Sequence, residues 1–255
     1  MTEYTDHHGP DGLRIRGTVI VVPGRGETRA AYNRFGRRLA ADAYRVRVID
    51  APDLDADDPA GSLTRFGARL ADAVEGTAAR DGVIHPVVVV GADTGAVATA
   101  ALLGGESSSS DGRPDAVVLA GLPGHAATRV GAWDHELDVR TACPAHRATL
   151  TGDPLIRRGS LDDAVPDVLL AAAYGGDIGV PVLILVGDAD PLADRDALVR
   201  TATSLPRARL SVVRGAHHDV LNDLQHRSVA AETVTFLETL RDDLVPLITV
   251  RSSAW

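Results

Sequence analysis

Four short runs of aliphatic and β-branched residues constrain the fold of this chain more than any other feature. They are TVIVV at residues 18–22, VVVV at 87–90, AVVLA at 116–120 and VLILV at 182–186. Polar residues do not alternate within them, which is typical of strands buried on both faces of a parallel sheet. Such strands need helices between them to cover both faces.

Helical patterns fill the intervals between these runs. In residues 29–41 apolar side chains recur at roughly helical spacing among charged ones, which predicts an amphipathic helix. Further helices are predicted over residues 63–79, after Gly95 and over 229–240, and further strands at RVRVIDAPD and ARLSVV. The order predicts an α/β fold with a doubly wound, mostly parallel sheet.

The length of 255 residues, with 45% hydrophobic content, fits one large domain over residues 1–255. The hydrophobic periodicity becomes irregular over residues 125–179, where Arg, Asp, His and Pro accumulate. We expect this stretch to be a small cap insertion that lies over the carboxyl ends of the strands. The apolar residues expected to form its core or a pocket wall include Leu137, Leu150, Leu155 and Leu169.

Charge and residue usage exclude several functions. The formal net charge is −9, so a nucleic-acid partner is not expected. The sequence has no lysine, which excludes a lysine Schiff base and the P-loop lysine. Cys143 is the single cysteine, as expected of a reduced compartment. With a polar, acidic N-terminus and no apolar run of about 20 residues, the sequence predicts a cytoplasmic protein without a membrane span.

Residues 91–95, with the sequence GADTG, have the form G-x-nucleophile-x-G of a nucleophile elbow, with Asp93 at the centre. Such a sharp strand-to-helix turn exposes its central side chain over the sheet, and small residues relieve the crowding around it. A simpler interpretation is that Asp93 only caps the following helix, because aspartate is among the best N-cap residues.

Two later loops carry an acid and a histidine. Asp188 and Asp190 follow the strand at 182–186, and His217 and His218 follow the last strand. The chain order nucleophile, acid, histidine is that of a hydrolytic triad on a doubly wound sheet. Asp190 is the expected acid, with Asp188 as the alternative. A metal site is not predicted, since adjacent histidines on an extended segment point to opposite sides and no third ligand has recognisable spacing.

The loop after the first strand, PGRGET at residues 23–28, has two interpretations. Its G-x-G and the later Asp50 match part of a dinucleotide fingerprint, but Arg29 stands where the third glycine would be. Alternatively, the loop supplies a backbone N–H to an oxyanion hole, most plausibly from Arg25.

On these motifs the chain resembles the α/β-hydrolases over nearly its whole length, and most closely their monoacylglycerol lipase and lysophospholipase-like branch. The resemblance implies Asp93, His218 and Asp190 as catalytic residues, and the amides of Arg25 and Thr94 as the oxyanion hole. Lipases of that branch carry serine at the nucleophile position, whereas epoxide hydrolases and haloalkane dehalogenases carry aspartate. Neither of these two subfamilies is matched in full, because Tyr174 is the single tyrosine near the cap and Thr94 replaces a tryptophan, although Trp133 in the cap offers an indole N–H.

The sequence therefore predicts a hydrolase that acts on a small organic substrate, such as an epoxide or an ester, through a covalent intermediate on Asp93. Trp133 and Tyr174 are the expected substrate-binding residues, and no cofactor is expected. The alternative is a binding protein or a non-hydrolytic acid/base enzyme on the same fold, for example a cyclase-like or degenerate lipase-like member, with His218 and Asp93 as the proton-transfer pair.

Overall fold

A single sheet organises the computed structural model, which describes residues 4–80, 82–105, 113–125, 129–249 and 251. Within these residues seven strands pair in the order β1-β3-β2-β4-β5-β6-β7. Their bounds are β1 Thr5–His7, β2 Gly17–Val22, β3 Tyr44–Val48, β4 Val87–Ala92, β5 Ala116–Ala120, β6 Val182–Gly187 and β7 Ala208–Val213. Only the short β1 pairs antiparallel to its neighbour, so the predicted doubly wound, mostly parallel sheet is confirmed.

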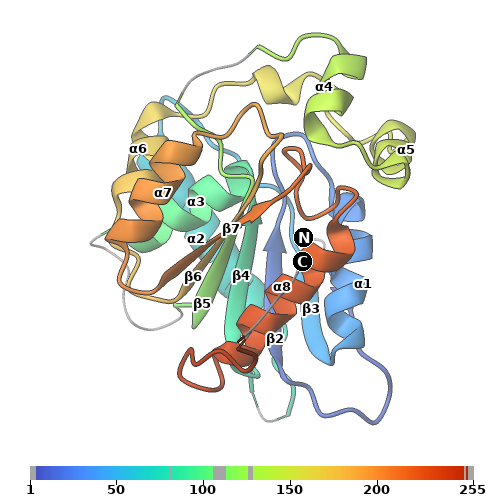
Figure 1. Cartoon of the computed structure of the whole chain (residues 1–255), viewed down its shortest axis with the longest axis vertical. Coiled ribbons are helices and arrows are strands. Elements are labelled where there is room, and N and C mark those ends of the chain that lie inside the picture. The colour runs from blue at the N-terminus through green and yellow to red at the C-terminus, as the bar shows by residue number, and fades with distance from the viewer. Residues whose placement is uncertain (1–3, 81, 106–112, 126–128, 250, 252–255) are drawn as a thin grey trace.

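Helices cover both faces of this sheet (Figure 1). In β2, Val19 and Val21 join one apolar core, whereas Ile20 and Val22 join the other. The helices α1 and α8 lie on the first face, and α2, α3, α6 and α7 on the second (Figure 1). Their bounds are α1 Asn33–Ala41, α2 Pro59–Glu75, α3 Thr94–Gly104, α6 Asp167–Gly175, α7 Arg195–Ser204 and α8 His226–Thr239. Burial on both faces explains why the strand sequences lack polar alternation.

Several element boundaries differ from the predicted ones. The helix predicted over residues 29–41 begins with a 3-10 turn, η1 Arg29–Tyr32, before α1. The helix predicted from residue 63 starts at Pro59, because the Asp58 side chain accepts a hydrogen bond from the Gly61 N–H at 3.0 Å and caps it. The edge strand β1 was not predicted, since three residues are too few to carry a periodic signal. Among the described helices, none is both long and apolar enough to cross a membrane.

The segment between β5 and β6 divides into two parts. The helices α4 Trp133–Arg140 and α5 Pro144–Gly152 lie beyond the ends of the strands (Figure 1), followed by the 3-10 turn η2 Ser160–Asp162. Hydrogen bonds connect this part to the loops after β2 and β7. They run from Arg157 N to Gly26 O at 2.9 Å and from His218 N to Val139 O at 3.2 Å. By contrast, α6 packs into the second core with α3. Residues 126–128 of the expected cap lie outside the described residues.

The leucines expected within the insertion do not share one core. Leu137 and Leu150 are buried in the first core, and Leu169 is buried in the second core. Leu155 is 79% exposed. The reason is that α6 supplies part of the cover for the sheet, whereas α4 and α5 pack down on the site loops.

We expect Leu183→Ala to lower the free energy of unfolding by about 2–5 kcal/mol, because Leu183 is fully buried in the sheet and its removal leaves a cavity. Leu155→Ala is the matched control and should change stability by less than about 0.5 kcal/mol. Urea unfolding of the three proteins measures both effects. Equal losses in the two variants would contradict the assignment of the core.

Candidate active site

Asp93 occupies the sharp turn between β4 and α3. Its backbone has φ 46° and ψ −117°, a strained conformation for a residue with a side chain. Its carbonyl accepts the first helical hydrogen bonds, from Ala96 N and Val97 N, both at 3.0 Å. The Asp93 side chain makes no capping hydrogen bond to α3, so the interpretation of Asp93 as only an N-cap is wrong. The carboxylate is instead directed at the first loop and at His218.

The glycines of the elbow leave no room for larger side chains. A Cβ at Gly91 would lie 2.5 Å from the carbonyl oxygen of Gly95, and one at Gly95 would lie 2.4 Å from that of Val22. On the first loop, a Cβ at Gly24 would lie 2.7 Å from the Cβ of Asp93. The two glycines of GADTG are therefore required by the tight turn of the elbow and by its close approach to β2.

His218 lies between two carboxylates. Its Nε2 is 3.2 Å from Oδ1 of Asp93, and its Nδ1 is 2.9 Å from Oδ2 of Asp190. The His218 side chain is fully buried. Asp188 points elsewhere, since it is exposed and accepts a hydrogen bond from the Gly215 N–H. Of the two candidate acids, the structure brings Asp190 to the histidine.

Arg25 holds both oxygens of the Asp93 carboxylate. Its backbone N–H donates to Oδ2 at 2.8 Å, its Nε donates to Oδ2 at 2.9 Å, and its Nη2 donates to Oδ1 at 2.9 Å. The same guanidinium donates through Nη1 to the carbonyl oxygens of Leu161 and Asp163, at 3.1 and 2.7 Å. The amide of Arg25 was expected at the site, but its side chain was not. The only signal for the side chain in the sequence was its place in a loop directly after a buried strand.

The charges at the site stabilise ionised forms. Burial alone would raise the pKa of Asp93, but the charges of Arg25 and His218 and their hydrogen bonds hold this pKa well below its ordinary value. Burial alone would lower the pKa of His218, but Asp190 and Asp93 raise it to about 10. At neutral pH the resting site therefore holds an imidazolium between two carboxylates.

Two cavities, of about 310 and 390 Å³, lie beside this group. Arg25 and residues 163–165 line both of them, so they form the wall between the two. Thr94 lines the second cavity, and its buried hydroxyl has no partner among the described residues. Asp93 lines neither; it borders only a third cavity of about 10 Å³ together with His218. The Arg25 side chain thus separates Asp93 from the two larger spaces.

Trp133 and Tyr174 do not themselves line these cavities, although Tyr174 contacts Pro123 and His125, which line the first one. The Tyr174 hydroxyl donates to the carbonyl oxygen of Pro123 at 3.1 Å, and its ring lies against His125, with 5.5 Å between ring centroids. Trp133 packs under the guanidinium of Arg158 at 5.1 Å. Neither residue is among those that line the three cavities beside Asp93.

Sequence comparison identifies one family. The profile of the family described as "Serine aminopeptidase, S33" matches residues 62–225, more than half of the chain. The matched region includes Asp93, Asp190 and His218, and it excludes the first loop with Arg25. No curated protein sequence matches the chain significantly.

Solved structures match over nearly the whole chain. Monoacylglycerol lipase from Paleococcus ferrophilus has 16% identity and a TM-score of 0.69, with 94% of this chain and 99% of that chain covered. A soluble variant of monoglyceride lipase from Saccharomyces cerevisiae has 14% identity, a TM-score of 0.69, and 93% and 91% covered. Rv0554 from Mycobacterium tuberculosis has 18% identity, a TM-score of 0.68, and 93% of each chain covered. These similarities confirm the expected fold.

The raised pKa of His218 predicts a pH-dependent stability. With a folded pKa of about 10 and an unfolded pKa of ~6.5, its charge stabilises the fold fully below pH ~6.5, and this contribution is lost as the pH rises toward 10. We expect the stability advantage of the wild type over His218→Gln to shrink across this window, by up to about 1.4 kcal/mol per pH unit. Urea unfolding from pH 6 to 10 measures it, with His135→Gln on the exposed face of α4 as the matched control. An advantage that is constant with pH would mean that the fold does not raise the pKa of His218.

Proposed function

The chain belongs to the serine aminopeptidase S33 family of α/β-hydrolases, and we propose that it hydrolyses a small organic substrate, such as an epoxide or an ester, through a covalent ester on Asp93. The observation that carries the proposal is the arrangement of Asp93, His218 and Asp190 at the strained elbow, with contacts of 3.2 and 2.9 Å. A carboxylate needs no base before it attacks, because it is already ionised.

In the first proposed step, Oδ1 of Asp93 attacks an alkyl carbon of the substrate, such as a ring carbon of an epoxide, and the bond from that carbon to its leaving oxygen breaks. The leaving oxygen takes the electron pair and a proton from the imidazolium of His218. This proton donor compensates for the absence of paired tyrosines near the cap. Ester formation also removes the negative charge of Asp93, one of the two anions that keep His218 protonated, so the imidazole is left as a base.

In the second step, water loses a proton to His218 and adds to the carbonyl carbon of the ester. The backbone N–H of Arg25, 2.8 Å from Oδ2, would stabilise the resulting oxyanion. Collapse of this intermediate breaks the bond between Cγ of Asp93 and the former Oδ1, which leaves with the product. That oxygen takes the proton of the newly added hydroxyl, so the alcohol is released and the carboxylate is restored beside an imidazolium. Asp190 holds the imidazole in the orientation that both steps need.

The proposal requires the Arg25 side chain to leave the carboxylate. While Arg25 is paired, both oxygens of Asp93 are occupied and the carboxylate is shielded from the larger cavities. Withdrawal of the guanidinium would expose Oδ1 and join the two cavities at the elbow, while the backbone N–H stays near Oδ2. The main chain of Arg25 would then serve the oxyanion, and its side chain would control access.

We further propose that residues 125–179 include a cap within a single domain over residues 1–255. Support comes from α4, α5 and η2, which lie at the strand ends that carry Asp93 (Figure 1), and from the cavity walls formed by residues 161–165. The carbonyl oxygens of Leu161 and Asp163, which accept hydrogen bonds from Arg25, belong to this segment. Movement of the cap and withdrawal of Arg25 from Asp93 would therefore be linked.

The closed ion pair also favours a second candidate, a non-hydrolytic acid/base enzyme or a binding protein on the same fold. In that case Arg25 stays on Asp93, and a ligand occupies one or both of the cavities that Arg25 lines. Here Asp93 would orient Arg25 and His218 instead of attacking a carbon.

Isotope incorporation tests the covalent route. During turnover of epoxide, halide and ester panels in heavy-oxygen water, one oxygen of the Asp93 carboxylate should be replaced by solvent oxygen, because water attacks its carbonyl carbon. Mass analysis of the peptide that holds Asp93 detects the label, and the peptide that holds Asp190 is the internal control. With halide substrates, whose leaving group needs no proton, His218→Gln should accumulate the ester. Turnover without label would refute the covalent route. If the wild type shows no turnover and Asp93→Ser gains esterase activity, the second candidate, a binding protein or a non-hydrolytic enzyme on the same fold, would be favoured.

Replacement of Arg25 tests its proposed control of access. We expect Arg25→Met to raise the rate of ester formation on Asp93 by roughly tenfold, equivalent to about 1.4 kcal/mol, because it frees the nucleophile and keeps the backbone N–H. Single-turnover mass analysis gives this rate. Arg65→Met, which removes an exposed ion pair on α2, is the matched control. A lower rate in Arg25→Met would show that the guanidinium assists the reaction instead of blocking it.

A further inference from the structure

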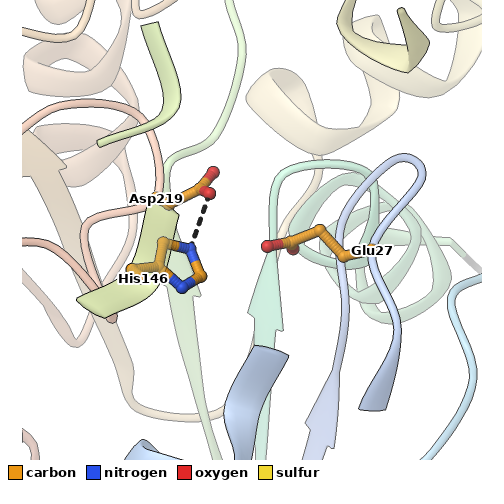
Figure 2. A group of neighbouring side chains, drawn as sticks. All are labelled: Glu27, His146 and Asp219. Carbon is orange, nitrogen blue, oxygen red and sulfur yellow. Dashed lines mark hydrogen bonds and ion pairs between the residues drawn. The ribbon is translucent and has the colours of Figure 1, made fainter. Parts of the chain in front are cut away.

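A second group of polar side chains lies next to the elbow and has no part in the proposed hydrolysis. Glu27 comes from the first loop, His146 from α5, and Asp219 from the position after His218 (Figure 2). Their potential ligand atoms all lie within 4.8 Å of one another, and His146 Nε2 is 2.9 Å from Asp219 Oδ2. The three side chains are 8% exposed or less. Residues far apart in the sequence thus present a histidine and two carboxylates to one buried point.

One carboxylate oxygen of this group lacks a partner. Oε2 of Glu27 accepts hydrogen bonds from the Gly24 N–H, at 3.0 Å, and from the Tyr32 hydroxyl. Oε1 is buried and has no hydrogen-bond partner among the described residues. Figure 2 shows the carboxylate of Glu27 directed toward His146 and Asp219. A buried carboxylate oxygen is costly without a partner, so its direction points to a ligand between these side chains.

The local charges call for a positive ligand. The one guanidinium in the cluster is that of Arg140, which is 1% exposed. It bonds Glu136 at 2.9 Å and lies 3.5 Å from Asp219. Together with Glu27, three buried carboxyl groups share this single guanidinium. Buried charges are usually paired or coordinate metal ions, and a divalent cation would balance this excess of carboxyl groups.

Size also restricts the ligand. The potential ligand atoms of the three side chains lie within 4.8 Å of one another, which leaves room between them for a single small ion. Adjacent ligand atoms at about 2.1 Å from one metal ion are about 3.0–3.4 Å apart, so the hydrogen bond of 2.9 Å between His146 Nε2 and Asp219 Oδ2 would open only slightly to admit the ion. A small rotation of Glu27 would complete the set. An organic ligand would not fit in this space.

We infer that Glu27, His146 and Asp219 bind one divalent transition-metal ion, of the Zn²⁺ or Mn²⁺ class. One imidazole nitrogen and two carboxylate oxygens suit these ions, and water would fill the remaining coordination positions. The ion would tie together the first loop, α5 and the loop after β7. Because Arg25 and His218 lie on two of these segments, the ion would hold the site in shape. The inference is independent of the reaction proposed for Asp93.

Binding of the metal alone to the full chain tests the inference. After dialysis against a chelator, titration calorimetry with ZnCl₂ or MnCl₂ should give one ion per chain. The Tm should rise by about 5 °C at a metal concentration 100 times the Kd. His146→Gln should weaken binding at least tenfold, whereas His135→Gln, an exposed histidine on α4, should not. Glu27→Gln should also weaken binding, with the exposed Glu75→Gln as its control.

Several results would overturn the inference. One is the absence of saturable binding by the wild type, or binding that is unchanged in His146→Gln. Another is that, after treatment with the chelator, Glu27→Gln is more stable than the wild type and neither protein binds metal. This result would mean that a protonated Glu27 completes the cluster. If the carboxylate variants do not fold, Co²⁺ binding by the wild type remains decisive, since the visible absorption of bound cobalt reports nitrogen and oxygen ligation. Spectra identical to those of aqueous Co²⁺ would also overturn it.

Discussion

The ion pair between Arg25 and Asp93 is the interaction on which the rest of the site depends. A carboxylate that is 4% exposed, on a residue with positive φ, would be costly without a cation at hand. Arg25 supplies that cation from the neighbouring first loop and also binds main-chain oxygens of Leu161 and Asp163. A single side chain thus neutralises the elbow, connects it to the inserted segment and separates the two larger cavities.

The two polar clusters of the site share the loops that carry them. Arg25 and Glu27 lie two positions apart on the first loop, yet one bonds Asp93 and the other points toward His146. His218 and Asp219 are adjacent, and they too belong to different clusters. A displacement of either loop would therefore change the environment of both clusters. This coupling gives the inferred metal site a physical means of influencing the geometry at Asp93.

The fold was largely predictable because its signal is local. Strands buried on both faces must be continuous apolar runs, and each of the four runs is a strand of the sheet. The errors arose where local signals compete or are too short. Asp58 and Pro59 start α2 earlier than its apolar periodicity suggests, and β1 depends on its pairing with β3. Leu169 was assigned to the cap by its place in the sequence, but it packs with α3 on the sheet.

The sequence by itself determined the order of the site loops and the residues at their tips, because parallel strands bring their carboxyl ends to one edge. From that rule Asp93, Asp190 and His218 could be expected together. Only the tertiary structure brought Asp190 and not Asp188 to His218, and only it paired the Arg25 side chain with both oxygens of Asp93. It also placed Trp133 and Tyr174 outside the lining of the two cavities. It also assembled Glu27, His146 and Asp219, which have no recognisable spacing in the chain. Side-chain direction and contacts between distant segments depend on packing in three dimensions, and no local pattern in the sequence encodes them.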